Sequence, residues 1–296
     1  MNFEKKLDRR KKYYLIFDCE TATLPCAAQY NGNGKQNIAI AKPLIYDLGW
    51  QIIDRQGRVY IRRSYLISEI FSVPSVFNTA YYASKRPLYI QKLENNEIIL
   101  TDWKTATKKL SSDLKLVESV GAYNSMFDFK KAIPFTERYI KALYSDSFYD
   151  WEARQNKICD NIAKGKAKNN NKQFNGEVFS FRGRSYPLFD LWGLSCKYLL
   201  NNDDYKTQCI NNKWTTASGK FFKTSAEMTY RYITNDSDFI ESHTALEDAI
   251  IESQILTEII KRAKNKFEMG IIFFPFRELG TVENFKSTHN DIFDLF

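Results

Sequence analysis

Long apolar runs, a secretion signal and paired cysteines are all missing from this sequence, and each absence excludes a class of protein. The longest purely apolar run near the C-terminus is Ile271–Phe274, far short of the roughly 20 residues that a transmembrane helix needs. The first residues, Met-Asn-Phe-Glu-Lys-Lys, contain no apolar stretch typical of secretory signals. The five cysteines form no C-x-x-C pair, so we expect reduced, mostly structural thiols and no zinc site. A cytoplasmic protein without a membrane partner is therefore expected.

Acidic residues are in the minority, and the basic excess is clustered. The chain has 43 Lys and Arg against 35 Asp and Glu, a net charge of +8. Residues 1–12 carry six basic and two acidic side chains (6 − 2 = +4), and residues 161–185 carry six and one (6 − 1 = +5). Such stripes fit a polyanionic partner, most simply nucleic acid. A solvated tail and a solvated loop would show the same charge, so this pattern supports a nucleic-acid partner only together with other evidence.

Apolar periodicity predicts an α/β protein in which helices cover a mixed sheet. The composition, 44% hydrophobic and 15% aromatic, is ample for a packed core. Residues 68–100 fit helical turns and loops, and residues 201–223 are polar and turn-rich. The expected strands are Tyr13–Phe17, a hairpin of Ile45–Ile53 and Arg58–Ile67, Val117–Ala122 and Ile271–Phe274. The expected helices are Thr101–Leu116, Met126–Leu143 (kinked or restarted at Pro134), Pro187–Leu200, Ser225–Ile233 and Thr244–Ala263.

The same patterns divide the chain into three parts. Residues 1–12 are a basic N-terminal arm, residues 13–265 form one domain, and residues 266–296 are a C-terminal extension. Within the domain, residues 152–186 are rich in Asn, Lys and Gly and lack an apolar period, so we expect a basic, mobile insertion. The abundance of Asn, Lys, Ile, Tyr and Phe is typical of an AT-rich genome, and a bacterium or a phage-infected cell is the expected setting.

Three carboxylates follow predicted strands. Asp18 and Glu20 come after the first strand, and residues at i and i+2 of a strand project to the same face. Two carboxylates this close repel unless a cation lies between them, and oxygen-rich clusters suit Mg²⁺ or Mn²⁺. Asp128 follows the strand at 117–122, in the first turn or so of a helix, where the helix dipole favours it. Each feature would also fit an ordinary polar strand end or a surface residue.

Histidine is scarce, and one of the two histidines lies beside a predicted helix start. Thr244-Ala-Leu-Glu247 matches the capping box S/T-x-x-E, with Thr244 as the N-cap. This places His243 just outside the helix, on a segment free to adjust, and fixes Asp248 in the first turn. The other histidine, His289, lies in the polar tail without such a context. Four carboxylates and one histidine suit a two-metal site that cleaves phosphodiester bonds.

Together the three segments resemble the motifs of the DEDDh family of 3′–5′ exonucleases, which includes polymerase proofreading subunits, RNase T and oligoribonuclease. The segment FDCET is similar to the first motif, D-x-E-T, and YNSMFD is similar to the second, N-x-x-F-D. HTALEDA is similar to the third, H-x-x-x-x-D. The resemblance spans residues 13–262, is concentrated in these short segments, and keeps the family's motif order.

The resemblance implies an RNase H-like fold, a mixed five-stranded sheet flanked by helices, here with insertions. It implies hydrolysis at the 3′ end of nucleic acid with release of nucleoside 5′-monophosphates. Two divalent cations, Mg²⁺ or Mn²⁺, would lie about 3.5–4 Å apart, one activating water and the other stabilising the leaving 3′ oxygen. Asp18 would bridge them, Glu20 and Asp248 would hold the first, and Asp128 would support the second. The remaining implied roles are a general base, His243, and three substrate-side residues, Thr21, Tyr123 and Asn124.

Departures from the family pattern bear on the substrate. Ala22-Thr23-Leu24-Pro25 stands where family members often carry a glycine, and Tyr123 stands where a histidine commonly precedes the asparagine. The distance of 115 residues from Asp128 to His243 is longer than in compact members, and the basic Asn/Lys stretch fills much of it.

A single-stranded 3′ end, DNA rather than RNA, is the expected partner, with a polymerase or another replication or repair protein as a further one. The alternatives are a 3′–5′ exoribonuclease and a nucleic-acid-binding or polymerase-accessory module without turnover. Degenerate modules usually lose a metal carboxylate, and none is missing here. The sequence leaves the oligomeric state open.

Overall fold

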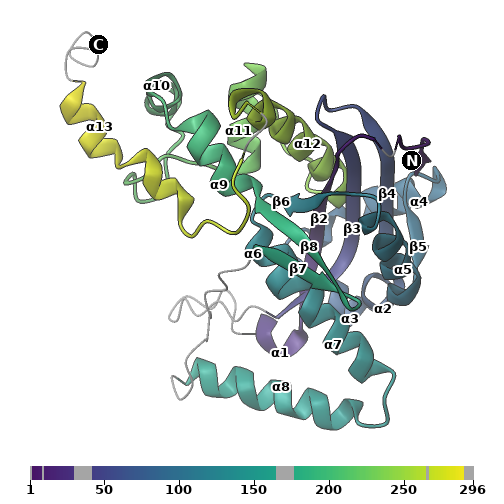
Figure 1. Ribbon diagram of the computed structural model, residues 1–296. Helices are drawn as coiled ribbons and strands as arrows, with labels where there is room; N and C mark the ends of the chain where they lie inside the picture. Colours follow the sequence, from purple (N-terminus) through teal and green to yellow (C-terminus); the bar gives the residue numbers. More distant parts are fainter. Residues whose placement is uncertain (1, 9, 30–41, 165–176, 265–266, 290–296) are drawn as a thin grey trace.

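A mixed β-sheet with helices on both faces forms the body of the protein (Figure 1). The computed structural model describes residues 2–8, 10–29, 42–164, 177–264 and 267–289. Within these residues the sheet has eight strands, so the α/β class is confirmed and the count of five is wrong for the sheet as a whole. The strands are β1 (Phe3–Glu4), β2 (Tyr13–Thr23), β3 (Pro43–Asp54), β4 (Val59–Ile67), β5 (Ile99–Thr101), β6 (Ser119–Ala122), β7 (Val178–Phe181) and β8 (Arg184–Asp190).

The strand order is β1-β4-β3-β2-β6-β8-β7, with β5 paired to β4. Strands β2, β3 and β4 are antiparallel neighbours, whereas β6 runs parallel to both β2 and β8. The predicted hairpin of β3 and β4 is confirmed. Its turn is held by the Asp54 carboxylate, which accepts the N–H groups of Gln56 and Arg58, and by Gly57 at a φ of 76°.

Strand β2 is longer than its apolar run, and this extension carries the acidic motif. Pairing with β3 continues past Phe17 to Thr23, with a register shift between Glu20 and Thr21. Side chains alternate along the strand: Leu15 and Phe17 enter one apolar core and Ile16 enters the other. Asp18 and Glu20 continue the alternation of Ile16, so they face the layer that contains helix α12 (Ala245–Arg262).

Helices occupy the remaining regular segments of the described chain. The short elements beside β2 and β4 are α1 (Pro25–Ala28), α2 (Ser68–Phe71), α3 (Pro74–Phe77), η1 (Ala83–Lys85) and α4 (Arg86–Glu94). Those around the later strands are α5 (Trp103–Leu114), α6 (Ser125–Phe127), the π-turn η2 (Asp128–Ala132), α7 (Ile133–Leu143), α8 (Phe148–Ala163), α9 (Leu191–Ser195), the π-turn η3 (Cys196–Leu200), α10 (Asp203–Asn211), α11 (Ala226–Thr234), η4 (Pro275–Leu279) and α13 (Val282–Thr288). None of the helices in the described ranges combines the length and the apolar character needed to cross a membrane.

Several predicted elements need correction. Residues 152–163 belong to helix α8, and residues 178–181 and 184–186 belong to β7 and β8, so these parts of the expected mobile insertion are regular structure. Residues 165–176 lie outside the described residues. The helix predicted from Pro187 begins only at Leu191, because Arg184–Asp190 pairs with β6 as a strand. Residues 203–211, expected as turns, form α10.

Two further differences come from backbone hydrogen bonding. The helix predicted over 126–143 contains a π-turn, Asp128–Ala132, just before Pro134. Proline has no N–H for the helical ladder, and the wider turn accommodates it without a break. The strand predicted at 271–274 does not form in the described chain. Only Gly270 pairs there, in a single bridge to Phe189.

Gly49 allows helix α12 to approach the sheet, and Gly49→Ala is expected to destabilise the protein by about 3 kcal/mol. A Cβ at Gly49 would lie 2.2 Å from the Leu246 nitrogen and 2.3 Å from the Ala245 carbonyl carbon, and these backbone atoms cannot rotate away. Urea unfolding measures the effect. Gly183→Asn is the matched control, because nothing lies within 4 Å of a Cβ there and asparagine accepts its φ of 75°. Unchanged stability of Gly49→Ala would contradict the close packing.

Candidate active site

A cavity of about 410 Å³ lies where β2, the end of β6 and the start of α12 meet. Strand β2 contributes Asp18 and Glu20, and the segment after β6 contributes Tyr123 and Asn124. The segment before α12 contributes Glu241 and His243, and the first turns of α12 contribute Asp248 and Glu252. The complete lining is Asp18, Glu20, Tyr123, Asn124, Trp192, Thr224, Ser225, Ala226, Glu241, His243, Asp248 and Glu252. The structure therefore brings six of the eight predicted site residues into one cavity.

Glu20, His243 and Asp248 form a group in this cavity that could hold a metal ion. Each offers one ligand atom, and these atoms all lie within 4.8 Å of one another. Glu20 comes from the sheet, whereas Asp248 is fixed in the first turn of α12. Carboxylate oxygens and an imidazole nitrogen are suitable donors for Mn²⁺, and the carboxylates suit Mg²⁺.

Asp128 is buried and is not part of the described cavity lining. It is buried on the π-turn η2, where its Oδ1 accepts a hydrogen bond from the Cys19 thiol at 3.1 Å. Its charge still acts on Asp18, whose pKa it helps to raise. Asp128 is therefore close enough for its charge to act on Asp18, but it lies outside the cavity lining and is hydrogen-bonded to Cys19.

Two buried carboxylates were missed by the sequence reasoning. Glu252 lies one turn after Asp248 on α12, lines the cavity, and accepts the Tyr123 N–H at 3.1 Å. Asp190 ends β8 and accepts the Ser125 N–H at 3.0 Å. The spacing of four between Asp248 and Glu252 on one helix face was a usable signal. Asp190 had no comparable signal, because the prediction placed it inside a helix.

The start of α12 is held by a residue far away in the sequence. The Asp47 carboxylate on β3 accepts the Ala245 N–H and the Tyr89 hydroxyl, both at 2.9 Å. The Thr244 hydroxyl donates to the Glu247 carboxylate at 2.8 Å instead of accepting a helix N–H. The predicted helix start is correct, but the predicted capping-box bonds are wrong. The sheet itself fixes the first turn that carries Asp248.

His243 occupies an unusual backbone position at the cavity wall. Its φ of 49° lies in the left-handed region, which costs energy for most residues. The ring stacks on Tyr82, with centroids 4.3 Å apart and planes 14° apart, and Nδ1 lies 3.7 Å from a Glu241 oxygen. Burial, and then the charge of Lys85, lower the pKa of His243 below its ordinary value of 6.5. The imidazole is therefore neutral at neutral pH and able to accept a proton.

The other predicted substrate-side residues differ in their accessibility. Asn124 is exposed, with a φ of 80° that asparagine tolerates, and Tyr123 is tied by its hydroxyl, which donates to the Thr224 carbonyl at 2.6 Å. Thr21 follows the register shift in β2 and is half-buried, and it is not among the described residues that line the cavity. The hydrogen bond of its hydroxyl thus fixes the position of the Tyr123 ring.

The two basic stretches are not placed at the cavity by the described residues. In the N-terminal arm, Arg10 pairs with Asp8, and Lys12 pairs with Glu118. In the second stretch, Arg182 bonds the Thr107 hydroxyl on α5 at 2.6 Å. Lys166, Lys168 and Lys172 lie outside the described residues. Their contact with backbone phosphates stays a prediction.

No family model, curated protein or solved structure matches this chain. The chemistry of the cavity therefore has to be inferred from its own residues.

Burial, and after it mutual repulsion, raises the pKa values of the carboxylates around the cavity. Burial, and then the charges of Glu252, Asp248, Asp128 and Glu20, raise the pKa of Asp18 well above its ordinary value. Burial and neighbouring carboxylates likewise raise the pKa of Glu20 to about 9 and that of Asp248 to about 8. The pKa of Asp128 is raised to about 7, chiefly by burial. Excess buried negative charge of this kind fits bound divalent cations, which would remove the repulsion.

Burial and repulsion of these carboxyl groups predict that the metal-free protein loses stability as pH rises from about 5 to about 8. The folded-state pKa values of Glu20 and Asp248 lie above their ordinary values of 4.5 and 3.8. Between these two sets of pKa values the folded protein therefore holds protons that the unfolded chain has lost. The resulting stabilisation is complete below the ordinary pKa values and is lost as pH rises through the folded-state pKa values. Melting temperatures in EDTA across this range measure the effect.

Mn²⁺ is expected to restore the stability that the metal-free protein loses as pH rises to about 8. At a concentration one hundred times its Kd, a ligand of the folded state contributes about 2.7 kcal/mol, which raises the melting temperature by about 5 °C. The variant Glu20→Gln/Asp248→Asn should lose most of both the pH dependence and the Mn²⁺ shift. An undiminished Mn²⁺ shift in that variant would place the cation elsewhere.

Proposed function

We propose that this chain is a metal-dependent 3′–5′ exonuclease of the DEDDh type, acting on single strands, with DNA favoured over RNA. The observation that supports this most strongly is the convergence of three separate segments on one cavity. Asp18 and Glu20, then Asn124, then His243 and Asp248 line the same space although more than two hundred residues of chain separate the first from the last. These are the residues that the resemblance to the family assigns to the site.

The sheet supports an RNase H-like fold as part of the same proposal. Its five central strands, β4-β3-β2-β6-β8, form a mixed sheet whose two faces are covered by separate apolar clusters with their helices. Strands β1, β5 and β7 extend this sheet at its edges. In this proposal they are additions to the five-stranded core that the family resemblance implies.

Asp18, Glu20 and Asp248 would hold divalent cations in the cavity, with Asp128 behind them. Bound Mg²⁺ or Mn²⁺ supplies Lewis acidity toward the phosphodiester oxygens and lowers the pKa of water. The protein's own part is to fix the donors, and it does so with a strand, a helix start anchored by Asp47 and a buried π-turn. Rigid supports of this kind keep the donor geometry constant during turnover.

His243 would take the proton of the attacking water. Its pKa is lowered, so the ring is uncharged at neutral pH and accepts a proton as the water oxygen attacks phosphorus. The bond from phosphorus to the 3′ oxygen of the preceding nucleotide then breaks. The products are a nucleoside 5′-monophosphate and a strand shortened by one nucleotide with a free 3′ hydroxyl.

The experiment that tests this function follows end-labelled strands. Single-stranded DNA and RNA of the same sequence, labelled at the 5′ end, are incubated with the protein in Mn²⁺ and in EDTA. We expect a ladder of products shortened from the 3′ end in Mn²⁺, faster with DNA, and none in EDTA. Faster hydrolysis of RNA would favour the exoribonuclease. Binding of the strands without any shortening would favour the accessory module.

A further inference from the structure

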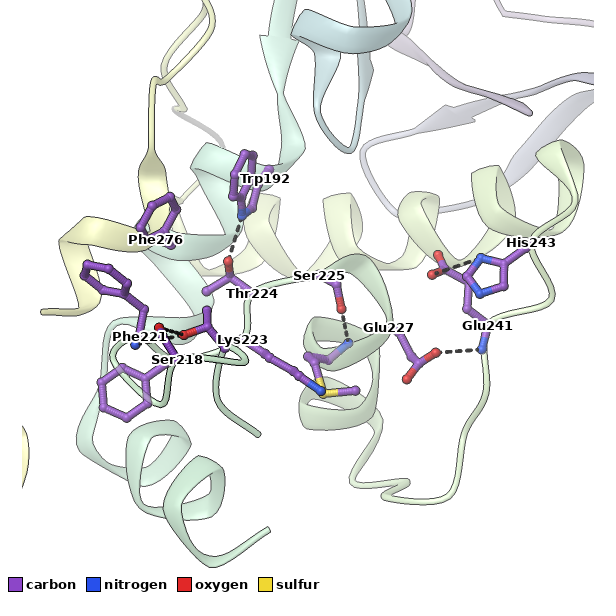
Figure 2. Close-up of a pocket in the computed structure, with 13 residues that line it drawn as sticks. Trp192, Ser218, Phe221, Lys223, Thr224, Ser225, Glu227, Glu241, His243 and Phe276 are labelled. Carbon is purple, nitrogen blue, oxygen red and sulfur yellow. Dashed lines mark hydrogen bonds and ion pairs between the residues drawn. The ribbon is translucent and has the colours of Figure 1, made fainter. Parts of the chain in front are cut away.

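A second cavity of about 560 Å³ opens beside the candidate active site (Figure 2). It shares five lining residues with the first cavity: Trp192, Thr224, Ser225, Glu241 and His243. Figure 2 shows His243 and Glu241 at one end and the rings of Trp192, Phe221 and Phe276 at the other. The two cavities are therefore adjacent, and the second extends from His243 toward the aromatic rings.

Aromatic rings form the far end of this second cavity. Trp192 and Phe276 are stacked, with ring centroids 6.1 Å apart and planes 22° apart, and Phe221 meets Phe276 edge-on at 5.0 Å. All three side chains are partly exposed and line the cavity. Nucleobases stack on such rings regardless of sequence.

The rings are held in place before any ligand arrives. The Trp192 indole N–H donates to the Thr224 hydroxyl at 2.8 Å. Phe221 lies in a tight turn closed by the bonds from the Thr216 N–H to the Phe221 carbonyl and from the Lys223 N–H to the Trp214 carbonyl. A platform that is already ordered loses little entropy when it binds.

Cationic side chains border the aromatic end. Lys223 lines the cavity and is exposed, and Lys220 lies over the Phe221 ring with its nitrogen 5.4 Å from the centroid. Acidic residues, Glu227 and Glu241, lie at the opposite end, beside His243. The charge along the cavity thus changes from basic to acidic toward the reacting end. A strand whose phosphates pass the lysines would bring its 3′ end to the carboxylates.

We propose that this second cavity, the aromatic subsite, receives the nucleobases that precede the 3′-terminal nucleotide of an unpaired strand. Trp192, Phe221 and Phe276 stack on those bases, and Lys223 contacts a backbone phosphate. The inference rests on the proposed exonuclease function and adds to it a preference for single-stranded ends longer than one nucleotide. Paired bases cannot enter, because their faces are already stacked within the duplex.

The test uses a single-stranded DNA oligonucleotide with 2-aminopurine as its second base from the 3′ end. Phosphorothioate linkages and Ca²⁺ limit hydrolysis during the binding measurement. We expect wild-type protein to quench the 2-aminopurine fluorescence, and Phe276→Ala and Phe221→Ala to bind roughly 5- to 150-fold more weakly. Phe274→Ala is the matched control, since Phe274 is half exposed, neighbours Phe276 and lies outside the described cavity lining.

Lys223→Gln provides a second variant, because an exposed lysine can be replaced without loss of folding. It should reduce the slope of log affinity against log salt by about 0.7, the value for one phosphate contact on a single strand.

Equal quenching by wild type, Phe221→Ala and Phe276→Ala would overturn the subsite. Exonuclease activity on unmodified DNA is measured separately. If wild type is active and the aromatic variants bind DNA as wild type does, the subsite is refuted and the proposed function is not. Quenching without any hydrolysis would refute the proposed function alone.

Discussion

Asp18→Asn is expected to abolish hydrolysis of single-stranded DNA, with a loss of about 10⁴-fold in kcat. Asp18 lies in the middle of β2, and the charges of four other carboxylates act on it. Asparagine keeps the shape of the side chain but removes the charge that would hold a divalent cation between these groups. The measurement is the initial rate of shortening of a 5′-labelled strand in Mn²⁺.

The control for Asp18→Asn has to separate lost chemistry from lost folding. In EDTA the variant should melt at the wild-type temperature or above it, because a buried carboxyl group that repels its neighbours when ionised is gone. Asp146→Asn is the matched control, since Asp146 is exposed on the turn before α8, and this variant should keep wild-type activity. Activity within tenfold of wild type for Asp18→Asn would remove Asp18 from the site.

His243→Asn should lower kcat by about 10²- to 10⁴-fold, the range for loss of a general base. Asparagine is the appropriate replacement because His243 has a φ of 49°, and asparagine adopts left-handed conformations more readily than most residues. The Mn²⁺-induced rise in melting temperature should largely remain, because the carboxylates are unchanged. Single-turnover rates of the two proteins provide the comparison.

The pH profile adds a readout that a purely structural role would not change. The base must be neutral, and burial and Lys85 lower its pKa. Wild-type activity should therefore fall on the acidic side only below pH 6.5, and this limb should be missing in His243→Asn. His289→Asn is the matched control: His289 stacks on Phe285 at the end of α13, and its loss should leave rate and profile unchanged. A wild-type rate for His243→Asn would exclude the base assignment.

The parts of the site that the sequence predicted are those determined by local rules. Strand periodicity placed Asp18 and Glu20 on one face, and in the structure they continue the alternation of Ile16 toward the layer of α12. The apolar stripe of α12 gave its position, with Asp248 in the first turn. Both rules depend on neighbours in the chain, so a single sequence is sufficient to apply them.

Elsewhere, local propensity was overruled by pairing between distant segments. Residues 184–190 form a strand because β6 offers a parallel partner, although the same stretch was predicted to open a helix. The start of α12 is fixed by a bond from the Ala245 N–H to Asp47, 198 positions away, and not by the capping box. Long-range contacts of this kind leave no periodic signal in the sequence.

By itself, the sequence determined the α/β class, the central strands and the order of the residues assigned to the site. Only the tertiary structure decided that Glu252 joins these carboxylates, that Asp128 lies behind them, and that an aromatic cavity continues from His243. The reason is physical. Periodicity fixes the face on which a side chain lies, whereas the neighbours that share its space, and hence its pKa, depend on how separate elements pack.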